Sequence, residues 1–308
     1  MTYDKIVLVT RKTRLANLID RFNTMDQARF YLEQAGLDFS DYAREDDAYE
    51  RALNYLKRSL EHRDMQQQTI DRSLLPTFRF APGDLVVTLG GNGLVANTAK
   101  YVGTTPIVPV NPEPERFDAI LVPFAVSQAR SAVERVISEV THAREVTLAR
   151  VDLSDGQRLL AFNDFFIGAR THVSARYRVT WSGRTEDQSS SGIIVSTAAG
   201  STGWLTSVFN MAAGVSAFTG GTPGRPIRLD WNDPRLVFAV REPFASQRWS
   251  ATIVAGLVEP RQALRIESMM STEGVLFSDG VESDYLAFGA GLVATIQAAP
   301  ERVRLVWP

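Results

Sequence analysis

The sequence contains no cysteine. Disulfide bonds, thiolate zinc sites and cysteine nucleophiles are therefore excluded. It also lacks an excess of basic residues, because 33 Lys and Arg face 35 Asp and Glu and the formal net charge is −2. A protein that binds a nucleic-acid duplex needs a basic surface, so nucleic acid is not an expected partner.

Lysine is scarce, and its four positions all lie in the first third of the chain: Lys5, Lys12, Lys57 and Lys100. A phosphate group bound beyond residue 100 must therefore be held by arginine, backbone amides or a metal ion. No apolar run approaches the roughly 18 residues that cross a membrane. We therefore expect no membrane association and a cytoplasmic location.

The 308 residues, 44% of them hydrophobic, can bury a sizeable core, and the length favours two domains. Residues 1–138 alternate strand and helix patterns, which predicts a Rossmann-like α/β nucleotide-binding domain. In residues 139–308, short runs rich in Val, Ile, Phe and Thr alternate with turn signals. This pattern predicts an antiparallel β-sandwich, whose last roughly 20 residues could return to the first domain.

Two helices are expected before residue 70. Thr24 and Gln27 form a capping box ahead of a helix that extends to Gly36. The charged segment 41–68 has a helical period, and its acidic run around Glu45 reads as a solvated face.

The sharpest local feature is a glycine turn, residues 90–94. It lies between an apolar strand (84–89) and a helical segment (94–102). Glycine permits positive φ and a close approach of the backbone, so consecutive amides at a helix start can bind a phosphate. No Gly-Lys-Ser/Thr follows, which excludes a P-loop, whereas Gly91-x-Gly93-x-x-Ala96 fits the looser dinucleotide fingerprint. The alternative is a turn that only lets strand and helix pack.

A second feature is the segment 192–204, in which an apolar strand opens into small hydroxyl residues and then Trp204. Trp204 could stack on a base while Ser201, Thr202 and backbone amides bond to polar groups of the ligand. The alternative is a capped helix, with Ser201 or Thr202 as the cap and residues 204–211 packed inward.

Two shorter patterns carry carboxylates. Asn163-Asp164 precedes an apolar run, where Asp164 could accept from ribose hydroxyls and Asn163 could bind an amide or adenine edge. A surface turn is the alternative. Asp279-Gly280 alone usually marks a hairpin.

In this order, these segments resemble the NAD kinase family. That family's Gly-Gly-Asp-Gly turn is matched by Gly90 to Gly93, and its Asn-Pro by Asn111-Pro112. Its Asn-Glu/Asp pair, its Gly-Ser-Thr-Ala/Gly-aromatic segment and its late Asp-Gly are matched by Asn163-Asp164, by residues 200–204 and by Asp279-Gly280. The resemblance covers residue 84 to the end.

The resemblance implies an NAD kinase-like fold and transfer of the ATP γ-phosphate, with Mg²⁺, to the 2′-hydroxyl of NAD. NAD would bind in a cleft between the domains. The position of Asn92 would be catalytic, and so would Asp279, which would line the same site. No metal ion would be held by the protein. ATP phosphates would lie on Gly90, Gly91, Gly93 and Leu94. NAD would contact Asn163, Asp164, Ser191, Thr202, Gly203, Trp204 and Ser207. The partners would be small nucleotides and, as is common in the family, other copies of the chain in a dimer or tetramer.

The sequence departs from the family pattern at three positions. Asn92 replaces the catalytic aspartate, Ser191 precedes Gly192 where the family usually has Asp-Gly, and Leu94 replaces a threonine. Asparagine can orient a hydroxyl but cannot take its proton, and such assistance is worth ~10²–10⁴ in rate. A slower kinase and a catalytically silent dinucleotide-binding or regulatory protein are both compatible with Asn92. A lipid or small-molecule kinase with the same glycine turn is a further alternative.

The remaining polar groups give weaker signals. His62, His142 and His172 have no i, i+4 spacing, so we interpret them as structural rather than metal-binding. Arg225, Arg228 and Arg241 could reach a phosphate, but surface arginines are too common to single out.

Overall fold

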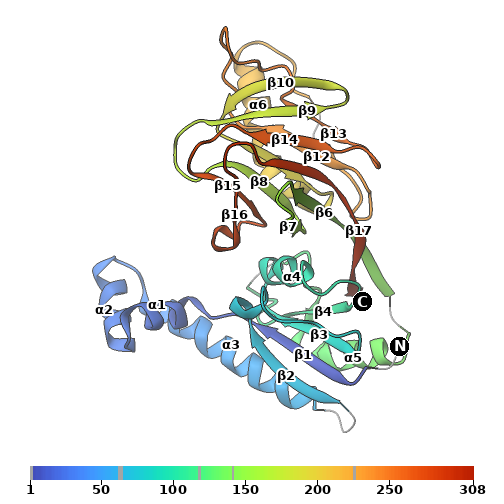
Figure 1. The fold of residues 1–308 in the computed structure, drawn as a ribbon. Coiled ribbons are helices and arrows are strands. Elements are labelled where there is room, and N and C mark those ends of the chain that lie inside the picture. The colour runs from blue at the N-terminus through green and yellow to red at the C-terminus, as the bar shows by residue number, and fades with distance from the viewer. Residues whose placement is uncertain (1–2, 62–64, 117–118, 141, 225–226) are drawn as a thin grey trace. The chain divides into compact units, whose positions relative to one another are not determined.

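The computed structural model describes residues 3–61, 65–116, 119–140, 142–224 and 227–308. His62 and Arg225 lie outside the described residues. The chain forms two compact units: unit 1 is Met1–Arg144 with Val303–Pro308, and unit 2 is Glu145–Arg302 (Figure 1).

Unit 1 is built on a parallel sheet in the order β2-β1-β3-β4. β4 also pairs in parallel with β5 and with the end of β17. The parallel direction brings the carboxyl ends of β1, β3 and β4 to one edge, where ligands of α/β sheets usually bind. The strands are β1 (Lys5–Thr10), β2 (Gln66–Asp71), β3 (Asp84–Leu89), β4 (Pro106–Asn111), β5 (Phe124–Ala125) and β17 (Val293–Trp307).

Two helices cover one face of this sheet. The apolar side chains of α3 (Phe39–Ser59) and α5 (Ala129–Ile137) form one buried core with those of β1, β3 and β4. The alternation of strand and helix confirms the predicted α/β class. The remaining helices and 3₁₀ turns of unit 1 are α1 (Arg14–Phe22), α2 (Met25–Gln34), α4 (Asn92–Ala99), η1 (Arg72–Leu74) and η2 (Val126–Gln128).

The predicted helix boundaries before residue 70 are partly right. The Thr24 side chain accepts from the Gln27 N–H and begins α2, as expected. The helix predicted over 41–68 was too long, because α3 ends at Ser59 and residues 66–71 form β2. Those residues pair along the whole of β1, and such tertiary pairing overrides a local helical preference.

The interpretation of the acidic run as a solvated face was wrong for Glu45. Its side chain is buried, and its carboxylate oxygens lie 3.3 Å from Arg11 Nη2 and 2.5 Å from Arg14 Nε. The two guanidinium groups outweigh the cost of burial and lower the pKa of Glu45. Glu45 therefore ties α3 to the segment that follows β1.

Unit 2 is a sandwich of two sheets, which confirms the predicted β-sandwich. The first has the order β7-β6-β17-β14-β9-β10, and the second, β13-β12-β11-β8-β15-β16, is antiparallel throughout. Their inner faces share one apolar core that includes Phe165, Tyr177 and Phe238. The strands are β6 (His142–Leu153), β7 (Arg158–Ala161), β8 (Asp164–Ala169), β9 (Ala175–Trp181), β10 (Arg184–Ser190), β11 (Ile193–Ser196), β12 (Leu236–Val240), β13 (Ala255–Val258), β14 (Leu264–Ser268), β15 (Gly274–Ser278) and β16 (Leu286–Ala287).

Helix α6 (Trp204–Phe218) follows η3 (Ala199–Thr202) and lies on the outer face of the second sheet. Leu205 is buried there against Val237 and Ala239 of β12. Gly203, at the N-cap position, makes no side-chain cap, and Met211 is exposed. The alternative of a capped helix is therefore wrong in its cap and at Met211, but the helix forms and Leu205 packs inward as it expected. Within the part of the chain that the structure describes, no helix has the length and apolar character needed to cross a bilayer.

Candidate functional site

The glycine turn joins the end of β3 to the start of α4 in unit 1. Gly91 is the N-cap, and Asn92 is the first helical residue. None of Gly90, Gly91 and Gly93 has a positive φ, so the turn does not use the left-handed backbone that glycine permits. A Cβ added at Gly91 or Gly93 would meet nothing within 4 Å, so the backbone there is open to close approach by a ligand. The first N–H groups of a helix have no partner within the helix, which suits a phosphate.

The buried side chain of Leu94 packs against the glycine turn. Its side chain is only 3% exposed, and a Cβ at Gly90 would lie 2.9 Å from Leu94 Cδ2. The Leu94 N–H donates to the Gly91 carbonyl at 3.0 Å. Leu94 thus holds the conformation of the turn, and its side chain is buried rather than exposed to solvent.

Tyr49 anchors the start of the same turn. Its hydroxyl donates to the Leu89 carbonyl at 3.0 Å and accepts from the Arg11 N–H at 3.0 Å. Burial raises the pKa of Tyr49 to about 12, so the hydroxyl keeps its proton and remains a donor. Because Arg11 follows β1 directly, this bond ties the carboxyl end of β1 to the end of β3, while the Arg11 guanidinium is paired with Glu45.

Asn92 is held by its own side chain. Its Oδ1 accepts the Leu121 backbone N–H at 2.9 Å. One lone pair of the amide oxygen is therefore used in a structural bond, and neither end of the amide group can take a proton at neutral pH.

In unit 2, hydrogen bonds bring Asn163, Asp164 and Asp279 together as the sequence predicted for one site. Asp279 Oδ1 accepts the N–H groups of Asn163 and Asp164 at 2.6 and 3.3 Å. Its Oδ2 accepts the Phe162 N–H at 3.0 Å, and its own N–H donates to the Asp164 carbonyl at 2.9 Å. We call Asp164 and Asp279 the acidic pair.

The loop after β11 locks this arrangement. Thr197 donates its N–H to the Asn163 carbonyl at 2.8 Å and its hydroxyl to the Phe162 carbonyl at 2.6 Å. A Cβ at Gly200 would lie only 2.1 Å from the Asn163 carbonyl oxygen. Only glycine fits there, so the Gly-Ser-Thr segment is packed directly on the Asn-Asp motif.

Asp164 is a buried acid. Asp164 is 6% exposed. Its burial raises the pKa of its carboxyl group to about 7, and the charge of Asp279 contributes to the same shift. A carboxyl group in this range can exchange a proton at neutral pH.

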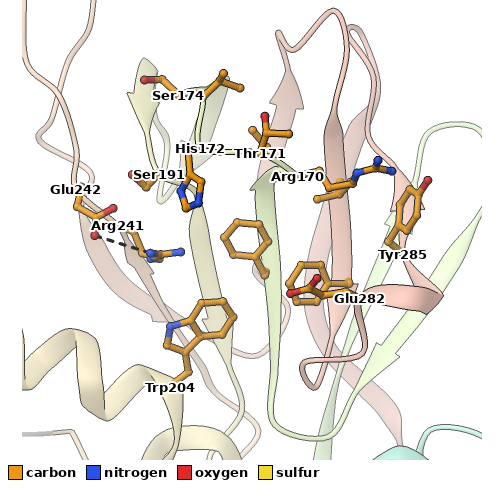
Figure 2. Close-up of a pocket in the computed structure, with 15 residues that line it drawn as sticks. Arg170, Thr171, His172, Ser174, Ser191, Trp204, Arg241, Glu242, Glu282 and Tyr285 are labelled. Carbon is orange, nitrogen blue, oxygen red and sulfur yellow. Dashed lines mark ion pairs between the residues drawn. The ribbon is translucent and has the colours of Figure 1, made fainter. Parts of the chain in front are cut away.

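A pocket of about 770 Å³ opens on the outer face of the second sheet (Figure 2). Phe166, Trp204 and Phe277 form what we call its aromatic floor. The rings of Phe166 and Trp204 are stacked, with centroids 5.6 Å apart and planes 12° apart, and Phe277 lies 5.0 Å from Phe166. A pocket of this size and lining suits an organic ligand with a planar ring.

Two glycines make room for this floor. A Cβ at Gly168 or at Gly192 would lie 2.7 Å from the Phe166 ring. Gly192 also has φ +108, which side-chain-bearing residues rarely adopt. Glycine is thus required at position 192 by the ring of Phe166 and by the backbone conformation.

Charged side chains border the floor, as Figure 2 shows. The Arg241 guanidinium lies 5.5 Å from the Trp204 ring centroid and 3.8 Å from Glu242 Oε1. Arg170 lies 3.4 Å from Glu273. In the part of the chain that the structure describes, no three His, Asp or Glu side chains are grouped to hold a metal ion.

The predicted site residues fall into separate groups. Ser191 and Trp204 line the pocket, whereas Thr202, Gly203 and Ser207 are exposed around the start of α6 and outside the lining. Phe166, Phe277 and Arg170 line the pocket, and the sequence did not predict them as site residues. Arg241, which the sequence did not single out, and His172, interpreted as structural, line the pocket as well. No local signal could place Arg241, because it is brought beside Ser191 by the pairing of β11 with β12, in which the Ser191 N–H donates to the Arg241 carbonyl at 3.0 Å.

No protein-family model matches the sequence, and no curated protein does either. Solved structures, by contrast, are similar to this chain in fold. A yeast NADH kinase complexed with NADH aligns over 100% of this chain and 84% of its own, with a TM-score of 0.61 and 14% identity. The fold is that of the NAD kinases. An NAD kinase from Archaeoglobus fulgidus in complex with ATP aligns over 98% of this chain and 93% of its own, with a TM-score of 0.54 and 15% identity. The NAD kinase fold accounts for an α/β unit followed by a β-sandwich in one chain.

Proposed function

We propose that the protein is an NAD kinase-type phosphotransferase that moves the γ-phosphoryl group of ATP to the 2′-hydroxyl of NAD or NADH. The observation that carries this proposal is the presence, on one face of one sheet, of an aromatic floor and a buried acidic pair. Phe166 and Asp164 are two residues apart on β8, so their side chains share a face. The aromatic floor suits a planar ring, and the acidic pair suits sugar hydroxyls.

The donor would be held at the glycine turn. The open backbone at Gly91 and Gly93 and the start of α4 suit the phosphates of ATP. Mg²⁺ would enter as the ATP complex and neutralise charge on the transferred group. Assembly into a dimer or tetramer and a cytoplasmic location stay predictions from the sequence.

The second candidate function is a catalytically silent dinucleotide-binding protein. It is favoured by Asn92, whose amide cannot accept a proton and whose oxygen is already bonded to Leu121. A thermal-shift and turnover panel with NAD, NADH, NADP and ATP-Mg separates the two. Stabilisation by a dinucleotide together with NADP or NADPH formation supports the kinase, whereas stabilisation without turnover leaves the silent protein.

Trp204→Ala is expected to weaken dinucleotide binding by about tenfold, because base stacking on an aromatic ring is worth ~1–3 kcal/mol. The matched control is Phe218→Ala at the other end of α6, where the side chain is 91% exposed and does not line the pocket. The test is to measure the dissociation constants of the wild type, Trp204→Ala and Phe218→Ala for the dinucleotide by calorimetry. Equal dinucleotide affinity of the wild type and Trp204→Ala would mean that the aromatic floor does not bind the dinucleotide, and it would favour a lipid or small-molecule kinase.

A further inference from the structure

Asn92 leaves the proposed reaction without a base at the glycine turn. A carboxamide has no basic oxygen at neutral pH, and the Asn92 Oδ1 accepts the Leu121 N–H at 2.9 Å. A hydroxyl acceptor that approaches the turn could hydrogen-bond to this side chain but could not pass it a proton. If the chain transfers a phosphoryl group with general-base assistance, another group must take the proton.

The strand geometry of β8 places the Asp164 side chain where it can do so. Phe165 belongs to the core between the sheets, so Asp164 and Phe166 lie on the opposite, outer face. Two residues along a strand span roughly 7 Å. That is about the distance from a nucleoside's ring to the far side of its sugar. A ligand with its ring on the aromatic floor can therefore bring a sugar hydroxyl to Asp164.

The Asp164 carboxyl is also the unpaired member of the acidic pair. The carboxylate of Asp279 accepts three backbone N–H groups, whereas no ion pair or hydrogen bond of the Asp164 carboxyl oxygens occurs among the described residues. The charged group that acts on Asp164 is Asp279, which disfavours its ionisation. A buried carboxyl without a cation keeps its capacity to accept a proton.

We propose that Asp164 is the general base of this chain and that it removes the proton from the acceptor hydroxyl in place of an acid at position 92. The inference rests on the proposed function. In the step, the O–H bond breaks and its proton moves to the Asp164 carboxylate. The freed electron pair forms the bond to the γ-phosphorus of ATP, and the bond from that phosphorus to the bridging oxygen breaks as ADP leaves. Asp279, expected from the sequence to be catalytic, is instead a positioning residue that holds the Asn163-Asp164 backbone.

The test compares the wild type with Asp164→Asn, measuring dinucleotide affinity and kcat with ATP-Mg from pH 5.5 to 8.5. We expect the wild-type kcat to rise with an apparent pKa near 7 as Asp164 ionises. Asp164→Asn should lower kcat at pH 8 by at least about 100-fold, abolish this rise, and leave the dissociation constant within about threefold. The matched control is Asp284→Asn in η4 (Glu282–Asp284), outside the pocket lining, which should keep the wild-type profile.

The outcomes separate the two proposals. A wild type that turns over while Asp164→Asn keeps its kcat and pH profile overturns the base alone. A wild type that binds dinucleotide without any turnover overturns the kinase function and the base with it. If Asp164→Asn fails to fold, Asp164→Glu carries the test. Moving the carboxyl by one methylene should lower kcat about tenfold and displace the pH midpoint, and an unchanged rate and midpoint would overturn the proposal.

Discussion

Asn92→Asp is expected to raise the rate of NADP formation by about 30-fold at pH 5.5 and by less than about threefold at pH 8. A carboxylate can keep the bond from the Leu121 N–H with one oxygen and offer the other to the acceptor hydroxyl. The start of α4 favours the ionised form of an acid at this position, so the new carboxylate stays charged at pH 5.5. Asp164, with a pKa of about 7, is then only about 3% ionised.

Steady-state rates of the wild type and Asn92→Asp across this pH range check the prediction. Asn92→Ala is the control, because it removes the acceptor of the Leu121 N–H without adding a base and should not raise the rate at any pH. A gain of the same size at every pH would mean that Asp164 does not supply the base. No gain at pH 5.5 would favour the catalytically silent protein.

Much of the fold could be read from local patterns. The apolar strand, three glycines and helix around residue 90 predicted the β3–turn–α4 unit because each part depends only on nearby residues. The short apolar runs and turn signals beyond residue 139 are equally local, and they predicted the sandwich. The helix over 41–68 was overextended because the pairing of residues 66–71 with β1 cannot be seen in a short window.

The missing parts of the site depend on contacts between distant residues. Phe166 meets Phe277 because β8 pairs with β15, and Arg241 reaches Trp204 because β12 pairs with β11. Asn92 loses its acceptor to Leu121, 29 residues along the chain. Sequence spacing gives residue types but not register, so it could name Trp204 and Asp164 without giving the aromatic floor or the unpaired state of the acid.

Asp164→Asn is also expected to stabilise the ligand-free protein at neutral and alkaline pH. The folded state raises the pKa of Asp164 to about 7, whereas an unfolded aspartate has a pKa of about 3.9. Between these values the unfolded chain has lost the proton that the folded chain retains, so the wild-type contribution to stability falls as pH rises from about 4 to about 7 and is constant above. Three pKa units correspond to at most about 4 kcal/mol. Asparagine cannot ionise, so the variant escapes this loss.

Urea unfolding at pH 4.5 and pH 8 measures the effect, and tryptophan fluorescence reports mainly on unit 2, which holds Trp181, Trp204, Trp231 and Trp249 of the five tryptophans. The free energy of unfolding should differ little between variant and wild type at pH 4.5, and the variant should gain up to about 4 kcal/mol at pH 8. Asp284→Asn should show no such pH-dependent difference. A pH-independent difference for Asp164→Asn would mean that Asp164 is ionised in the folded protein at acidic pH, and a base with an ordinary pKa could not give the midpoint near pH 7. Asp164 would destabilise the fold when charged, and it lies two residues from Phe166 of the aromatic floor on the same face of β8. A buried carboxyl kept at such a cost in stability is expected of a general base that works near neutral pH.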